Sequence, residues 1–344
     1  MKTGSKNLLF TLFLSTCASL HAQSYGETEL KSKFVSWGLD PSKPLTSINI
    51  KGSWAKFKKN KDIIVAVIDT GIQADHEFLA KNIYVPQGSK SSQNYGFDFS
   101  QGKITTTPFD QHGHGTHVAG IIKSIFPDVK ILPLKYYNPK ASGQASLEAT
   151  IRALRFAVDQ KVDIINYSGG GPEASIEELR ILKEAEQKGI LIIAAAGNER
   201  SNIDEKRNAY YPASYGLSNI ITVGAYNENL EIIPASNYGK NSVDIAAPGN
   251  RIQSAIPGNG AAQMTGTSQA TAFVTGVAAL VKSKHPELSY DQIKNIILSS
   301  SEKVKNFEGK ILGGGKLNAE NAISVADSVS EKLKNKVARS VANR

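Results

Sequence analysis

The fold of this chain is constrained most by five short apolar runs, rich in β-branched residues, that alternate with longer amphipathic stretches. Runs that are apolar throughout are typical of strands covered on both faces. They predict strands at residues 63–69, 129–137, 163–168, 190–197 and 219–226, and the amphipathic stretches predict helices at residues 117–125, 146–161, 175–188, 268–284 and 290–300. Strand and helix alternation of this kind predicts an α/β fold, a doubly wound, mostly parallel central sheet with helices on both faces.

Local signals suggest where two of these helices begin and one ends. Ser146 and Ser175 are each followed by a glutamate in the first turn, so both are predicted N-caps. Gly189 is a predicted stop at the C-terminal end of the second of these helices. In such folds ligands bind beyond the carboxyl ends of the strands, so candidate site residues are sought there.

Asp69 ends the first predicted strand, and three histidines gather in the segment His112-Gly-His114-Gly-Thr-His117. A strand-ending aspartate alone can simply cap the next turn. Histidines spaced H-x-H-x-x-H could ligate zinc, although Thr116 stands where metallo-β-lactamase-type hydrolases carry an acid. Alternatively, one histidine is a general base that Asp69 orients, as serine nucleophiles require.

The segment Gly266-Thr-Ser268-Gln-Ala supplies a serine where an apolar helix opens. Asp69, then H-G-T-H-V-A-G, then G-T-S-x-A together resemble the subtilisin-like serine proteases, or subtilases, over roughly residues 50 to 325. The resemblance implies a serine endopeptidase that works through an acyl-enzyme. Its implied catalytic residues are Asp69, His114 and Ser268, and His117 would then be a packed helix residue.

The same resemblance implies the residues that bind the substrate. Asn198, in Ala-Ala-Ala-Gly-Asn198, would be the side-chain donor of the oxyanion hole. Two edge segments would hold an extended polypeptide by β-augmentation, which tolerates many sequences and implies broad specificity. These segments are Ala141, Ser142 and Gly143, and Ser168, Gly169 and Gly170. Ala195, Gly170 and Gly197 would leave room for the first specificity pocket, with Glu199 near its mouth and Tyr210 at its floor.

Some positions depart from the family pattern. Gly169 and Ala145 stand where the family usually has leucine and an aromatic residue, so the more distant acyl-side pocket is expected to be open and unselective. Phe78 stands where many relatives have a calcium-binding aspartate, and the connection Phe126-Pro-Asp128 is short. Calcium needs six to eight oxygen ligands, so we expect no required cofactor and no strong calcium site, with weak calcium binding still open.

The two ends of the chain suggest processing. Residues 1–22 have Lys2, Lys6, an apolar stretch and a final Ala22, and so predict a signal peptide and a secreted or periplasmic protein. Lipid anchoring through Cys17 is the alternative. Residues 23–60 are then a lead-in or a short pro-segment, 61–327 the catalytic domain, and 328–344 a basic amphipathic tail. The tail either lies on the domain as a frayed helix or anchors the protein to an acidic surface.

The composition of the chain indicates which classes of partner it is not expected to bind. The formal net charge is +9 over 344 residues, without a dense basic stripe, so we expect polypeptide substrates and no nucleic acid. No transmembrane segment is expected in the mature chain. We further expect a monomer. An inactive relative that serves as a binding module would require loss of a catalytic atom, and Asp69, His114, Ser268 and Asn198 are all present.

Overall fold

The computed structural model describes residues 25–86 and 95–342, and the predicted signal peptide with Cys17 lies outside them. The strands are β1 (Ile64–Asp69), β2 (Phe97–Asp98), β3 (Lys130–Lys135), β4 (Ile164–Tyr167), β5 (Leu191–Ala195), β6 (Ile220–Tyr226), β7 (Ile245–Pro248), β8 (Ile252–Ile256), β9 (Gly260–Met264), β10 (Glu302–Lys303) and β11 (Gly315–Lys316). The α-helices are α1 (Glu27–Leu30), α2 (Ile50–Ala55), α3 (His114–Ile125), α4 (Gly143–Asp159), α5 (Ile176–Gln187), α6 (Thr267–Lys284), α7 (Tyr290–Ser299) and α8 (Ala319–Ala342).

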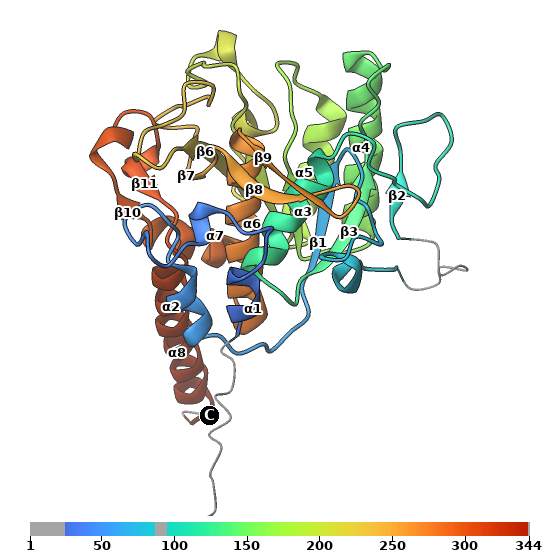
Figure 1. Ribbon diagram of the computed structural model, residues 1–344. Coiled ribbons are helices and arrows are strands. Elements are labelled where there is room, and N and C mark those ends of the chain that lie inside the picture. The colour runs from blue at the N-terminus through green and yellow to red at the C-terminus, as the bar shows by residue number, and fades with distance from the viewer. Residues whose placement is uncertain (1–24, 87–94, 343–344) are drawn as a thin grey trace, which may run out of the picture.

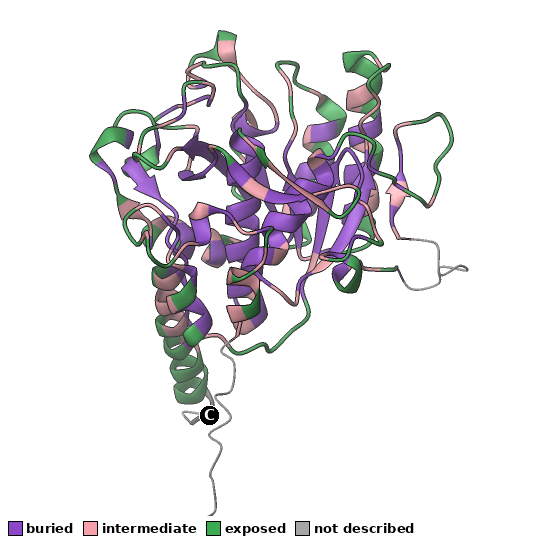
Figure 2. Ribbon diagram, viewed as in Figure 1, coloured by how far each residue is buried: buried purple, intermediate pink, exposed green. Residues whose placement is uncertain are grey.

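A central sheet organises the described residues, with strand order β10-β11-β7-β6-β5-β4-β1-β3-β2. All of its neighbours pair in parallel except β10 and β11. β8 and β9 form a separate antiparallel hairpin. The expected doubly wound, mostly parallel sheet is confirmed, and Figure 2 shows that most of its strand residues are buried.

Alternate residues of β1 face two different apolar cores. Val65 and Val67 pack into the core built with α3 and α6, whereas Ala66 and Ile68 pack into the core built with α4 and α5. Because successive side chains of a strand point to opposite faces, helices must cover both faces of the sheet. The arrangement is visible in Figure 1, where the helices flank the central strands.

Two predicted helix starts were wrong by three residues. α3 begins at His114 rather than at residue 117, and α4 begins at Gly143 rather than at residue 146. Ser142, not Ser146, is the N-cap of α4, since its hydroxyl accepts a hydrogen bond from Ala145 N at 3.2 Å. The predictions for α5 hold, because Ser175 accepts from Glu178 N and Gly189 follows the helix with a φ of +77°.

The segments at both ends of the described chain pack on the same side of the molecule. Ile48, Ile50 and Trp54 are buried in the core that contains α6, and Figure 1 shows α2 beside α8. Beyond residue 328, α8 continues the helix without a break, and Val329 and Leu333 still contact the core. Its outer turns are exposed, as Figure 2 shows.

Candidate active site

At the carboxyl end of β1 the structure brings two of the predicted catalytic residues, Asp69 and His114, together. Asp69 is the last residue of β1, and His114 is the first residue of α3. Asp69 is only 3% exposed, and its Oδ1 lies 2.7 Å from His114 Nδ1. A Cβ at Gly115 would lie 2.1 Å from Gly71 O, so only glycine lets the first turn of α3 approach the end of β1 this closely.

Asp110 holds the loop that presents His114, and sequence reasoning did not assign it a role. Its buried carboxylate accepts hydrogen bonds from Thr70 Oγ1, from the backbone N–H groups of His112, Gly113 and Thr116, and from Thr116 Oγ1, at 2.6 to 3.1 Å. Thr70 Oγ1 in turn accepts from Gly115 N. This network ties the start of α3 to the residue that follows Asp69. Its only sequence signal is an aspartate two residues before His112, in a segment rich in glycine.

Opposing effects set the pKa of His114. Burial favours the neutral ring, but the nearby Asp69 carboxylate favours the charged ring through its charge and its hydrogen bond, so the pKa of His114 is raised overall. His117 behaves differently, because burial lowers its pKa to about 4. Its Nε2 lies 2.9 Å from Ile252 O in β8, so the side chain is packed between α3 and β8, as expected for a buried helix residue.

The zinc interpretation of the three histidines finds no support in this geometry. His114 Nδ1 is committed to Asp69, and His117 is buried against two backbone carbonyl oxygens. Within residues 25–86 and 95–342, no group of three or more histidine, cysteine, aspartate or glutamate side chains is arranged to hold a metal ion.

Ser268 is the second residue of α6, and it is 7% exposed. Its Oγ donates to Ser168 O at 2.9 Å, and Ser168 Oγ donates back to Ser268 O at 3.3 Å. In the described structure no hydrogen bond joins Ser268 Oγ to His114. Catalytic hydrogen bonds often form only when the substrate is bound, so this rotamer is compatible with a nucleophile.

Asn198 follows β5, and its orientation is fixed by the start of α6. Its Oδ1 accepts from Thr267 N at 3.0 Å, so its Nδ2 is the atom left to donate. Nδ2 has no hydrogen-bond partner in the part of the chain that the structure describes, and Asn198 is exposed. The structure therefore presents one amide donor beside the helix that carries Ser268.

The predicted substrate-binding residues lie near the carboxyl ends of β4 and β5 and at the start of α4. Ala141, Ser142 and Gly143 lead into α4, while Ser168, Gly169 and Gly170 follow β4. Ala195 ends β5 and is buried. The ring of Tyr210 lies between two glycines, because a Cβ at Gly170 would be 2.5 Å from its Cε1 and a Cβ at Gly197 3.0 Å from its Cδ2. Glu199 is exposed, and its Oε2 accepts from Asn237 Nδ2 at 2.6 Å.

Known proteins of one family match most of this chain. The model of the Subtilase family matches residues 60–324. The chain belongs to the subtilase family. The Major intracellular serine protease of Bacillus subtilis (strain 168) is 36% identical over 243 residues, which cover 68% of this chain and 72% of that protein. Subtilisin DY of Bacillus licheniformis is 32% identical over 277 residues, 78% of this chain and 93% of that protein. Subtilisin-like protease 2 of Plasmodium falciparum (isolate 3D7) is 32% identical over 286 residues, 77% of this chain but only 20% of that protein.

This subtilase is therefore a serine endopeptidase that acts on polypeptides. None of the helices within the described ranges is both long and apolar enough to cross a membrane.

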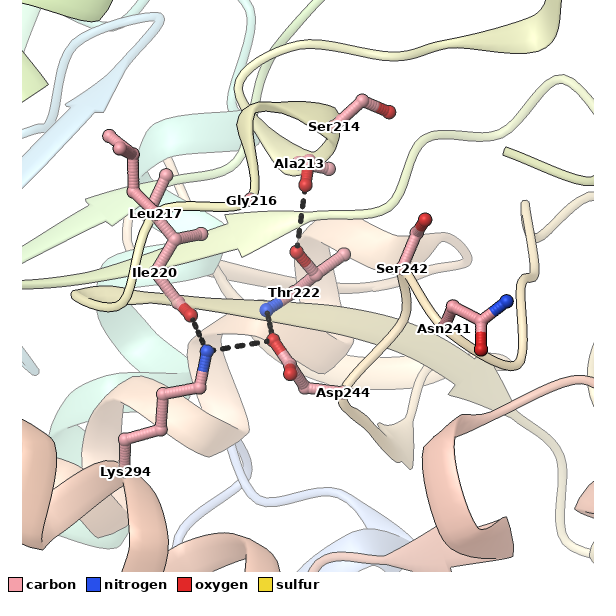
Figure 3. A pocket seen from close by; sticks show the side chains of 10 residues that line it. All are labelled: Ala213, Ser214, Gly216, Leu217, Ile220, Thr222, Asn241, Ser242, Asp244 and Lys294. Carbon is pink, nitrogen blue, oxygen red and sulfur yellow. Dashed lines mark hydrogen bonds and ion pairs between the residues drawn. The ribbon is translucent and has the colours of Figure 1, made fainter. Parts of the chain in front are cut away.

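A small polar pocket of about 110 Å³ lies away from the edge of the sheet that carries Asp69, among β6, the loop before β7 and α7. Figure 3 shows Lys294 reaching into it. The Lys294 ammonium group donates to Ile220 O and lies 3.4 Å from Asp244 Oδ2, which also accepts from Thr222 N. None of the predicted site residues lines this pocket, and the charge of Asp244 already has an ammonium partner. We therefore assign the pocket a structural role.

Proposed function

We propose that this subtilase cleaves peptide bonds with Asp69, His114 and Ser268 as its catalytic triad, through an acyl-enzyme. The observation that carries the proposal is the 2.7 Å contact between Asp69 Oδ1 and His114 Nδ1. A histidine held by a carboxylate at Nδ1 has its proton there, so Nε2 is left as the base.

The chemistry follows from these positions. Ser268 Oγ turns from Ser168 O toward His114, attacks the carbonyl carbon of the substrate and gives its proton to His114 Nε2. Asp69 stabilises the imidazolium that forms. Asn198 Nδ2 and the free N–H of Ser268 at the start of α6 donate to the negative oxygen of the tetrahedral intermediate. His114 then protonates the leaving amine, and water hydrolyses the ester on Ser268 by the same steps.

Substrate binding is proposed to use the two edge segments. Residues 141–143 and 168–170 would pair with an extended polypeptide on either side, mainly through backbone groups. Ala195, Gly197, Glu199 and Tyr210 would surround the side chain next to the cut. Because Tyr210 lies between Gly170 and Gly197, this pocket would be shallow and end on a phenol ring.

We further propose that residues 1–22 direct export, with residues 61–327 as the catalytic domain and 328–344 as a tail. The protein would then be secreted or periplasmic and monomeric, with a lipid anchor on Cys17 as the alternative. The relative from Bacillus subtilis is named an intracellular protease, so the family relation does not decide the location. Cell fractionation combined with mass spectrometry of the mature N-terminus tests this, and an uncleaved Met1 in the cytoplasm would contradict it.

The triad is tested with Ser268→Ala, which removes the nucleophile and little volume. We expect kcat to fall about 10⁶-fold, the loss measured for a subtilisin. Ser289→Ala is the matched control, because Ser289 caps α7 away from the site, and its activity should stay close to that of the unmodified enzyme. A correctly folded Ser268→Ala protein with near-normal activity would refute the assignment.

A further inference from the structure

A cavity of about 490 Å³ opens beside both proposed substrate-binding segments, since Gly143 and Gly170 are among the residues that line it. Two glycines let the second segment pack closely against neighbouring tyrosines. A Cβ at Gly169 would lie 2.6 Å from Tyr136 Oη, and one at Gly170 would lie 2.4 Å from Tyr211 O. An extended peptide held between the two segments would therefore direct one of its side chains toward this space.

The cavity is acidic in a chain whose formal net charge is +9. Two of its thirteen lining residues are glutamates, Glu173 and Glu178, and none of the described residues that line it is lysine, arginine or histidine. Three tyrosines, Tyr136, Tyr167 and Tyr211, supply flat walls. Such walls suit the aliphatic stem and the cationic head of a long basic side chain.

Glu178 lies in the first turn of α5 and is 1% exposed. Its two carboxylate oxygens accept hydrogen bonds from Tyr167 Oη and Tyr215 Oη, both at 2.8 Å. In the part of the chain that the structure describes, neither Glu178 nor Glu173 forms an ion pair. Burial raises the pKa of Glu178, although the two hydroxyl donors oppose that rise. A buried carboxylate without a cation is costly, and an incoming cation would offset this cost.

We propose that this cavity binds a lysine or arginine side chain of the substrate, on the acyl side of the cut bond, and that Glu178 and Glu173 select for it. The proposal rests on the proposed function, because it needs the substrate to run between residues 141–143 and 168–170. It replaces the sequence-based expectation of an unselective pocket. That expectation rested on Gly169 and Ala145, whereas the charge of the cavity would favour cations.

The test begins with a mixed peptide library. Its cleavage products show at which acyl-side position the identity of the side chain changes the cleavage rate. Peptides that differ only there, carrying lysine, arginine, norleucine, phenylalanine or glutamate, are then compared by kcat/KM. We expect lysine and arginine to exceed norleucine about tenfold, and glutamate to be the poorest. Raising the salt concentration should reduce the preference for lysine.

Variants assign the preference to the cavity. Glu178→Gln keeps the side-chain size and Glu173→Gln changes an exposed residue, so at least the second should fold normally. Each should reduce the ratio of kcat/KM for the lysine peptide to kcat/KM for the norleucine peptide. Glu177→Gln is the matched control, since Glu177 pairs with Arg180 on the outside of α5 and does not line the cavity. Its ratio should equal that of the unmodified enzyme.

Three results would overturn the proposal: no preference for basic residues at any acyl-side position, a preference for phenylalanine over lysine, or an unchanged ratio in both Glu178→Gln and Glu173→Gln. In each of these results the norleucine peptide is still cleaved. Failure of the triad would appear instead as activity retained in Ser268→Ala, so the two proposals fail in different ways.

Discussion

Individual residues of the site were predictable from sequence to different degrees. Asp69, His114 and Ser268 stand in short motifs that resemble those of one family, so the sequence alone was enough to predict them as the triad. The role of Asp110 could not, because its five hydrogen-bond donors come together only when the loop closes on Thr70. The burial of Glu178 could not be predicted either, since a glutamate in the first turn of a helix usually faces solvent.

The raised pKa of His114 gives a prediction for the pH dependence of activity. The base must be neutral, so kcat/KM should rise with pH as His114 loses its proton. Because Asp69 raises this pKa, the midpoint should lie above the ordinary histidine value of about 6.5. Asp69→Asn should move the midpoint to lower pH and reduce kcat about 10⁴-fold. A midpoint below 6.5, or one that Asp69→Asn leaves in place, would contradict this role for the pair.

The fixed orientation of Asn198 predicts which kinetic constant it affects. Its Nδ2 acts on charge that exists only in the transition state, so Asn198→Ala should lower kcat about 10²- to 10³-fold with little change in KM. Asn198→Asp is the control, because it keeps an acceptor for Thr267 N but has no amide donor. It should lose at least as much activity. A change confined to KM would mean that Asn198 binds the substrate in its ground state instead.

At the scale of elements, the sequence predicted the buried strands better than the hairpin. β1, β4, β5 and β6 are apolar on both faces and were located to within a few residues. β8 and β9 were missed, since β9 reads Gly-Ala-Ala-Gln-Met, which has little preference for strand structure. β8 is held partly by tertiary contacts, such as the bond from Ser254 Oγ to His117 O, which sequence patterns do not show.

The lead-in segment gives a prediction about stability. Trp54 is 3% exposed, and its Nε1 donates to Ile125 O at 2.8 Å. If residues 25–60 stay with the mature enzyme, Trp54→Ala should lower the free energy of unfolding by about 3–5 kcal/mol. The measurement is denaturant unfolding in a Ser268→Ala background, which avoids self-cleavage. Leu45→Ala, at a residue 77% exposed in the same segment, is the control and should change stability by about 0.5 kcal/mol or less. Equal stability of the two variants would favour a trimmed pro-segment.

For the molecule as a whole, the parallel sheet places residues that are far apart in the sequence at one edge. Asp69, Ser168 and Asn198 lie at or just beyond the carboxyl ends of β1, β4 and β5, and α3 and α6 begin at the same edge with His114 and Ser268. A parallel sheet brings these ends together whatever the lengths of the connections. The sequence motifs predicted that these residues share one edge of the sheet, whereas the shape and charge of the neighbouring cavity required the packed structure.

The global stability of the protein is expected to depend little on calcium. Phe78 stands where an aspartate would supply an oxygen, and its ring packs 4.6 Å from the ring of Phe34, with Lys123 Nζ 3.7 Å from its centre. In the short connection after α3, the carbonyl oxygens of Pro127 and Val129 already accept hydrogen bonds from Asn82. Calcium at 1,000 times the dissociation constant of a tight site would add about 4 kcal/mol, which corresponds to roughly 8–16 °C in a protein of about 150–250 residues and to somewhat less in a larger one. We expect a chelator to lower the melting temperature of the Ser268→Ala protein by less than about 2 °C, as measured by calorimetry. Restoring calcium should change it equally little. A fall of many degrees that added calcium reverses would show that a strong site exists elsewhere in the chain.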